Sequence, residues 1–252
     1  MDRAHVWIAW VVPLGALTIG LATLAWAFGR VGNGLPRAAA PTAANRARPP
    51  IPVAFAITDS ATMIDFAGPW EVFQDVMLDE GGSHDEMMPF RLYTVGDSRE
   101  PVTVTGGMKV VPDYAFSDAP APKIVVVGAQ RGSPALLAWL QSVAARRDTD
   151  IVMSVCTGAF KLGDAGLLDG KAATTHHDFF EAFAQRFPRV DLKRGRRFVQ
   201  SDDRIFTAGG LTSGVDLALH IVARYYGESV ASKTAAYMEY HSAGWRTGEA
   251  DK

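Results

Sequence analysis

The stretch that most constrains the fold is a short apolar strand that turns at once into a helix. Ile151–Val155 is mostly apolar and partly β-branched, as in a buried parallel strand. The only cysteine, Cys156, follows, and then Thr157, Gly158 and a helix-like run over 159–162. A cysteine at such a corner is typical of a nucleophile elbow, where helix N-terminal amides lower the thiol pKa and can hold an oxyanion. A buried structural cysteine is the alternative.

Other strands and helices alternate around this corner. Apolar runs and helical periodicity predict strands over 52–57, 90–95, 123–127, 197–200 and 205–207, a short strand at 110–111, and helices over 65–73, 134–147, 177–187 and 229–240. A further helix is expected to open at the run 209–214 and to continue through Val222. Pro69 is expected in the first turn of its helix. This alternation predicts an α/β fold with a mostly parallel sheet in three layers.

Composition excludes some classes of protein. A single cysteine rules out intramolecular disulfides and cysteine-rich metal sites. Residues 1–50 carry five arginines and one aspartate, whereas the remainder carries 20 basic and 26 acidic residues. The acidic remainder argues against direct nucleic-acid binding.

The N-terminal part has the composition of a membrane anchor. After a flank of residues 1–5, residues 6–28 contain no charged side chain and would span about 34 Å as a helix, enough for a bilayer core of about 30 Å. Residues 29–50, rich in Gly, Pro, Ala and Arg, are typical of a flexible linker. We therefore expect a folded domain over 51–245 and a short tail, 246–252.

A cleaved signal peptide is the alternative to the anchor, but its apolar region would be shorter, at about 7–15 residues. The Ala-rich candidate cleavage site, 38–40, lies far beyond the apolar run. Four arginines follow the segment and one precedes it, which favours a single-pass membrane protein with its domain on the cytoplasmic side.

Several candidate reactive groups follow predicted strands, where ligands bind in such sheets. Gly128 and Ala129 offer amides that would complete an oxyanion hole with the amide of Thr157. Asp65, in an apolar setting, is a candidate acid or base for the Cys156 thiol. Its alternative role is that of a helix N-cap.

Three further features are less specific. The run Gly209–Gly214, including Gly210, opens a predicted helix. It is interpreted either as an anion-binding nest or as a simple tight turn. His176 and His177 are candidate bases or packing residues. The basic run 193–197 is expected to be a solvated loop. No metal-ligand spacing, phosphate loop or dinucleotide fingerprint is present, so neither a metal nor a cofactor is expected.

Four blocks resemble a known family: Asp65–Phe73, Ser154–Phe160, Ala173–His177 and Thr207–Asp216. They resemble the PfpI/ThiJ superfamily, which is class I glutamine amidotransferase-like, and within it the branch of isonitrile hydratases and the sensor domains of AraC-type regulators. The resemblance covers residues 51–245. It implies a flavodoxin-like domain that forms a homodimer, with Cys156 as the reactive residue.

The resemblance also implies roles. Protease-like members have a histidine after the cysteine, whereas Thr157 stands here, as in isonitrile hydratases. By that likeness Cys156 would attack the isonitrile carbon, Asp65 would handle the proton and Thr157 would help to hold the intermediate. The hydratases continue their last block Glu-Tyr-Asp-Pro, whereas this chain has Glu-Tyr-His-Ser at 239–242.

Two functions therefore remain open. One is a cysteine-dependent hydratase, or a related hydrolase or lyase, that acts on a small C–N compound. The other is a ligand- or redox-sensing module. AraC-type regulators carry a C-terminal DNA-binding domain, and we expect none here because the chain ends soon after the last predicted helix.

Overall fold

The computed structural model describes residues 49–78 and 87–249. The predicted flank 1–5, the predicted transmembrane segment 6–28 and nearly all of the predicted linker lie outside the described residues. Among the helices of the two described ranges, none combines the length and apolar character needed to cross a bilayer.

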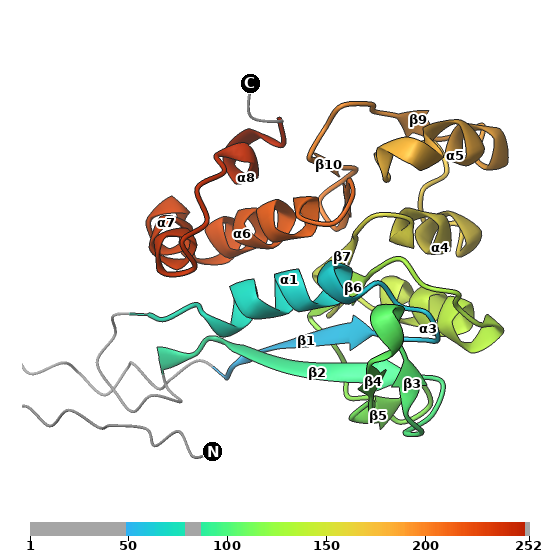
Figure 1. The fold of residues 1–252 in the computed structure, drawn as a ribbon, viewed down its shortest axis with the longest axis horizontal. Coiled ribbons are helices and arrows are strands. Elements are labelled where there is room, and N and C mark those ends of the chain that lie inside the picture. The colour runs from blue at the N-terminus through green and yellow to red at the C-terminus, as the bar shows by residue number, and fades with distance from the viewer. Residues whose placement is uncertain (1–48, 79–86, 250–252) are drawn as a thin grey trace, which may run out of the picture. The chain divides into compact units, whose positions relative to one another are not determined.

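A seven-stranded sheet organises the described residues (Figure 1). Its order is β10-β11-β7-β6-β1-β2-β5, and every neighbouring pair is parallel except the hairpin of β10 and β11. The mostly parallel sheet is thus confirmed. The strands are β1 (Ile51–Ala56), β2 (Phe90–Gly96), β5 (Tyr114–Ala115), β6 (Ile124–Val127), β7 (Ile151–Ser154), β10 (Phe198–Gln200) and β11 (Ile205–Ala208).

Two small sheets lie apart from the main one. The predicted short strand at 110–111 belongs to an antiparallel pair, β3 (Val102–Thr103) with β4 (Lys109–Val110). A parallel pair joins β8 (Ala172–Ala173) to β9 (Asp191–Leu192).

Helices cover both faces of the main sheet and give the predicted three layers. One apolar cluster joins the sheet to the helices α1, α6, α7 and α8, and a second joins the opposite face to α3, α4 and α5. Figure 1 shows α1 and α6 side by side. The helices are α1 (Met63–Gln74), α3 (Pro134–Ala145), α4 (Gly158–Asp164), α5 (Phe180–Arg186), α6 (Ser213–Tyr226), α7 (Glu228–Tyr237) and α8 (Gly244–Thr247), with short 3₁₀ turns η1 (Thr105–Gly107) and η2 (His177–Phe179).

Helix α1 begins two residues earlier than the sequence predicts. Pro69 is therefore its seventh residue, inside the helix, rather than a first-turn residue. Tertiary hydrogen bonds explain the early start: the Met63 amide donates to Thr105 Oγ1 (3.0 Å) and the Thr62 amide to the Ala129 carbonyl (2.8 Å). Contacts of this kind, over long sequence separations, leave no local signal.

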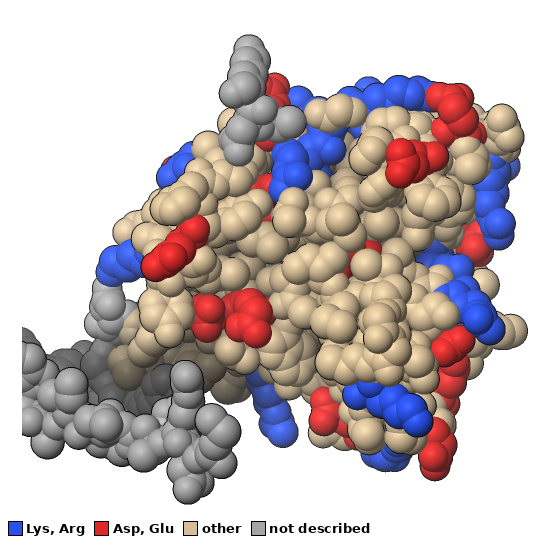
Figure 2. Space-filling view, in the orientation of Figure 1, with Lys and Arg blue, Asp and Glu red and all other residues tan. Residues whose placement is uncertain are grey.

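Part of the predicted tail packs on the domain. Helix α8 was not predicted, and its Trp245 is buried in the core. Glu249 continues beyond it and pairs with Arg196 in an antiparallel bridge. On the described residues of the face in Figure 2, acidic and basic groups are intermixed and lie mostly around the margin.

Candidate active site

Cys156 occupies a strained corner two residues after the end of β7. Its φ is +59°, a left-handed conformation that L-residues other than glycine rarely adopt. Two bonds hold this backbone: the Cys156 amide donates to the Gly209 carbonyl (2.7 Å), and Thr175 Oγ1 donates to the Cys156 carbonyl (3.0 Å). The predicted strand–turn–helix corner is therefore present.

Gly158 explains why helix α4 can start so close to the sheet. A Cβ at this position would lie 2.1 Å from the Val127 carbonyl oxygen, which no side chain can tolerate. Only glycine lets the first turn of α4 reach the end of β6 and face the sulfur with the amide of Thr157.

The Cys156 thiol is almost fully buried, with 6% of the residue exposed. Burial, followed by the negative charge of Asp65, raises the thiol pKa to about 11. Hydrogen bonds from the amides of Thr157 and Leu211 oppose this rise without cancelling it. The predicted lowering of the thiol pKa is therefore wrong, because desolvation and a neighbouring carboxylate outweigh the helix amides.

Asp65 is the third residue of α1 and is fully buried. Thr62 holds the N-cap position, so the alternative role of Asp65 as an N-cap is wrong. Its Oδ2 accepts a hydrogen bond from the Ala129 amide (2.9 Å), and the Cys156 thiol also hydrogen-bonds to the carboxyl. Among the described residues, no donor meets Oδ1 with ordinary hydrogen-bond geometry. Burial raises the pKa of Asp65 to about 6, against the lowering effect of these two contacts.

Gly128 and Ala129 both contact Asp65. A Cβ on Gly128 would lie 2.8 Å from the Asp65 Cβ, so glycine lets α1 approach the end of β6. The Ala129 amide, predicted to complete an oxyanion hole, already donates to Asp65. The amide that faces the sulfur together with that of Thr157 belongs instead to Leu211.

Together, the two pKa values define the resting state of the pair. At neutral pH the Cys156 thiol keeps its proton and the Asp65 carboxyl is ionised. The carboxylate is therefore ready to accept the thiol proton when the sulfur attacks an electrophile. The pair provides an uncharged nucleophile together with its own base.

The two histidines lie near this site, and each directs a ring nitrogen toward Asp178. The His176 ring packs on Gly210, where a Cβ would lie 2.2 Å from His176 Cδ2. His176 Nδ1 accepts a hydrogen bond from the Asp178 amide (3.2 Å), and the His177 side chain is 76% exposed. Within the described residues, the groups that influence the thiol pKa include no histidine.

Within the described residues, one group of side chains lies close enough together to bind a metal ion, and it belongs to this same segment. One ligand atom from each of His176, His177 and Asp178 lies within 4.8 Å of the others. The sequence predicted no metal ligands here. Since His177 and Asp178 are exposed and His176 already accepts a backbone hydrogen bond, this group also fits a solvated turn.

A surface cavity of about 210 Å³ opens beside Thr157. Its walls combine aromatic rings with charged groups, and its lining residues are Gln130, Thr157, Phe160, Lys161, Asp164, Phe179 and Arg186. Thr157 both lines the cavity and directs its amide to the sulfur, so the cavity adjoins the residue after Cys156, although neither Cys156 nor Asp65 lines it.

Sequence reasoning missed three contributors to the site. Leu211 has a positive φ of +53°, which the local sequence does not predict for a leucine between Gly210 and Thr212. Thr175 fixes the Cys156 carbonyl from the end of a two-residue strand. Arg197, predicted to be solvated, forms an ion pair with the fully buried side chain of Asp216.

Comparison with known sequences places these observations in context. The sequence pattern of the DJ-1/PfpI family matches residues 52–224. An isonitrile hydratase from Pseudomonas putida is 29% identical over 194 residues, which cover 75% of this chain and 78% of the hydratase. The transcriptional regulator GbdR from Pseudomonas aeruginosa is 28% identical over 198 residues, or 77% of this chain. The match spans only about half (52%) of that regulator.

Solved structures share the fold. A ThiJ/PfpI family protein from Pseudomonas syringae superposes with a TM-score of 0.63 at 27% identity, over 77% of this chain and 76% of its own. An AraC family regulator from Pseudomonas putida gives 0.64 at 22% identity, over 75% of this chain and all of its own. Drosophila melanogaster DJ-1beta gives 0.62 at 15% identity, over 77% of this chain and 100% of its own, and shows the fold alone.

Proposed function

Because this chain belongs to the DJ-1/PfpI family, with a DJ-1-like α/β fold, we propose that it is a cysteine-dependent enzyme of the isonitrile-hydratase type. It would add water to a small isonitrile and give an N-substituted formamide. The relationship to the hydratase of Pseudomonas putida, 29% identical over most of both chains, supports this assignment.

The observation that carries the proposal is the pair of Cys156 and Asp65. A fully buried carboxyl with a pKa of about 6 is costly to maintain, and beside a thiol its ionised form can act as a base. It contacts the single thiol of the chain at a strained corner. Such strain and desolvation are typical of reactive sites.

The geometry suggests an order of steps in which no cofactor takes part. The sulfur forms a bond to the isonitrile carbon, and Asp65 passes the thiol proton to that same carbon, which gives a thioimidate. Water then adds to this carbon, and one of its protons moves through Asp65 to the nitrogen. The C–S bond breaks, the hydroxyl proton returns to the sulfur and the formamide leaves.

The amides of Thr157 and Leu211 have a role in the last step. Both already hydrogen-bond to the sulfur in the resting site. Negative charge that develops on sulfur as the C–S bond breaks is stabilised most by donors already in position. Thr157 and Leu211 would therefore assist the departure of the thiolate.

Turnover by the full chain tests the proposal. A panel of isonitriles, amides and 2-oxoaldehydes would be incubated with the protein and with Cys156→Ala, and products identified by chromatography. We expect formamide from at least one isonitrile and no product from the variant. Equal turnover by the variant, or no reaction with any compound, would overturn the proposal.

The second candidate function is a ligand- or redox-sensing module, favoured by the 28% identity to the regulator GbdR over 77% of this chain. Mass spectrometry after mild peroxide treatment separates the two functions. Selective oxidation of Cys156 without turnover of the panel would favour sensing.

We also propose that residues 6–28 attach the domain to a membrane, with the domain in the cytoplasm, and that the protein acts as a homodimer. The uncharged run of 23 residues and the arginines after it support the anchor. Resistance of the domain to protease in intact cells and in spheroplasts is expected, whereas cleavage from outside would contradict the cytoplasmic orientation.

A further inference from the structure

A partly buried ion pair contacts the turn 209–212, which follows β11. Arg197 directly precedes β10, and Asp216 lies in the first turn of α6. Arg197 Nε donates to Asp216 Oδ2 (2.6 Å), and Nη2 lies 2.5 Å from the same oxygen. Ser242 Oγ donates to the other carboxylate oxygen (3.0 Å). The Asp216 side chain is therefore completely buried but fully bonded.

Arg197 also contacts the turn 209–212 at two points. Its carbonyl accepts a hydrogen bond from the Gly209 amide (2.8 Å), and its Nη2 donates to Thr212 Oγ1 (3.2 Å). Leu211 lies between these two contacts, and its amide faces the Cys156 sulfur.

The conformation of this turn needs external support. Leu211 has a φ of +53°, a left-handed backbone conformation that is strained for a residue with a side chain. The Cys156 amide donates to the Gly209 carbonyl, so the turn and the nucleophile also share a backbone bond. A shift of the turn would therefore withdraw the Leu211 amide from the sulfur.

We propose that Arg197 is a positioning residue: its ion pair with Asp216 and its bond to Thr212 hold the turn 209–212 so that the Leu211 amide points at the Cys156 sulfur. The inference rests on Cys156 being the reacting group of the proposed function. It assigns Arg197 a role in the reactivity of a thiol that it does not touch.

Alkylation of Cys156, the only thiol, by iodoacetamide at pH 8 tests the inference without any substrate. Thr212→Val removes only the hydroxyl that Arg197 reaches, because the Thr212 side chain makes no capping bond. Arg197→Lys keeps the charge beside Asp216 but loses the bond to Thr212 and also the bond to the Tyr240 hydroxyl (3.3 Å). Losing the amide would raise the thiol pKa and so lower the fraction of thiolate at pH 8. The higher nucleophilicity of the remaining thiolate offsets part of that loss, so we expect alkylation about threefold slower.

The direction of the change separates positioning from a merely structural role. A loosened fold would expose the buried sulfur and speed alkylation, whereas a displaced amide slows it. Arg196→Gln, which alters only the exposed contacts of Arg196 to Glu249 and Thr247, is the matched control and should leave the rate unchanged.

The inference is overturned if folded Thr212→Val reacts as fast as the parent or faster, or if Arg196→Gln slows alkylation as much. If Arg197→Lys does not fold, Thr212→Val alone decides. Slower alkylation in a protein that hydrates no isonitrile would refute the proposed function but support the positioning role.

Discussion

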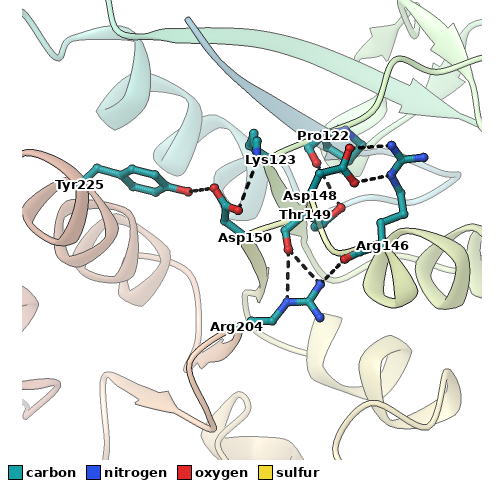
Figure 3. Close-up of polar contacts among 8 residues, drawn as sticks. All are labelled: Pro122, Lys123, Arg146, Asp148, Thr149, Asp150, Arg204 and Tyr225. Carbon is teal, nitrogen blue, oxygen red and sulfur yellow. Dashed lines mark hydrogen bonds and ion pairs between the residues drawn. The ribbon is translucent and has the colours of Figure 1, made fainter. Parts of the chain in front are cut away.

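The carboxyl ends and the amino ends of the parallel strands, called here the carboxyl edge and the amino edge of the main sheet, differ in their polar contacts. At the carboxyl edge, Cys156 has a strained backbone and Asp65 is buried with a raised pKa. At the amino edge, the residues before β6, β7 and β11 form a polar cluster in which each group shown has a partner (Figure 3). One edge holds strain and a costly charge, and the other is saturated with hydrogen bonds.

Arg204 is the centre of the cluster at the amino edge. It donates to the carbonyls of Ala144 (3.0 Å) and Arg146 (2.7 Å) at the end of α3, and to that of Thr149 from both Nε (3.2 Å) and Nη2 (2.8 Å). Thr149 Oγ1 in turn donates to the Pro122 carbonyl (3.1 Å). These bonds satisfy helix-end and loop carbonyls that would otherwise lack donors.

Asp150 extends the amino-edge cluster toward α6. It accepts a hydrogen bond from the Tyr225 hydroxyl (3.0 Å) and forms an ion pair with Lys123 (3.5 Å). Burial and the nearby Asp150 raise the pKa of Tyr225, so the hydroxyl remains a donor. The contrast suggests that the amino edge contributes stability and that the carboxyl edge gives some up for reactivity.

The largest expected effect comes from Asp65→Asn, which keeps an acceptor for the Ala129 amide but removes the base. Loss of a general base lowers turnover by about 10²–10⁴-fold. Because burial raises the Asp65 pKa from 3.8 to about 6, the ionised carboxyl costs the folded state about 3 kcal/mol. We therefore expect denaturant titration at pH 8 to show a more stable variant.

The pH dependence supplies the control for this variant. A raised carboxyl pKa lowers stability as the pH rises from about 4 to 6, so the advantage of Asp65→Asn should vanish below pH 4. Turnover of the parent should rise through about pH 6 as the carboxylate forms, and this limb should be absent in the variant. A parent rate that is flat between pH 5 and 7 would contradict the assignment of Asp65 as the base.

The sequence predicted the scaffold of the site better than its electrostatics. The apolar strand before Cys156 and the apolar setting of Asp65 are local signals, and the parallel topology brings the carboxyl ends of β1, β6, β7 and β11 to one edge. The sign of the thiol pKa depends on burial and on a carboxylate 91 positions away in the sequence. No local pattern encodes either quantity.

The ion pair of Arg197 with the buried Asp216 is a second feature that local sequence does not predict. In the sequence Arg197 belongs to a basic run typical of solvent, and its partner lies in the helix that follows the glycine-rich turn. Likewise, the Ala129 amide follows a strand as predicted, but the use of that amide is decided by α1, 64 positions earlier in the chain.

The smallest expected effect is at the amino edge and concerns stability alone. Arg204→Met keeps the aliphatic stem and leaves the carbonyls of Ala144, Arg146 and Thr149 without this donor, which we expect to cost about 2 kcal/mol in a denaturant titration. Arg146→Gln is the matched control: its ion pair with Asp148 is exposed to solvent, and breaking it should change the stability much less than Arg204→Met does. Turnover and Cys156 alkylation should equal those of the parent in both folded variants. If Arg204→Met instead changed either rate, the two edges would be coupled through β7, and the division between a stabilising edge and a reactive edge would fail.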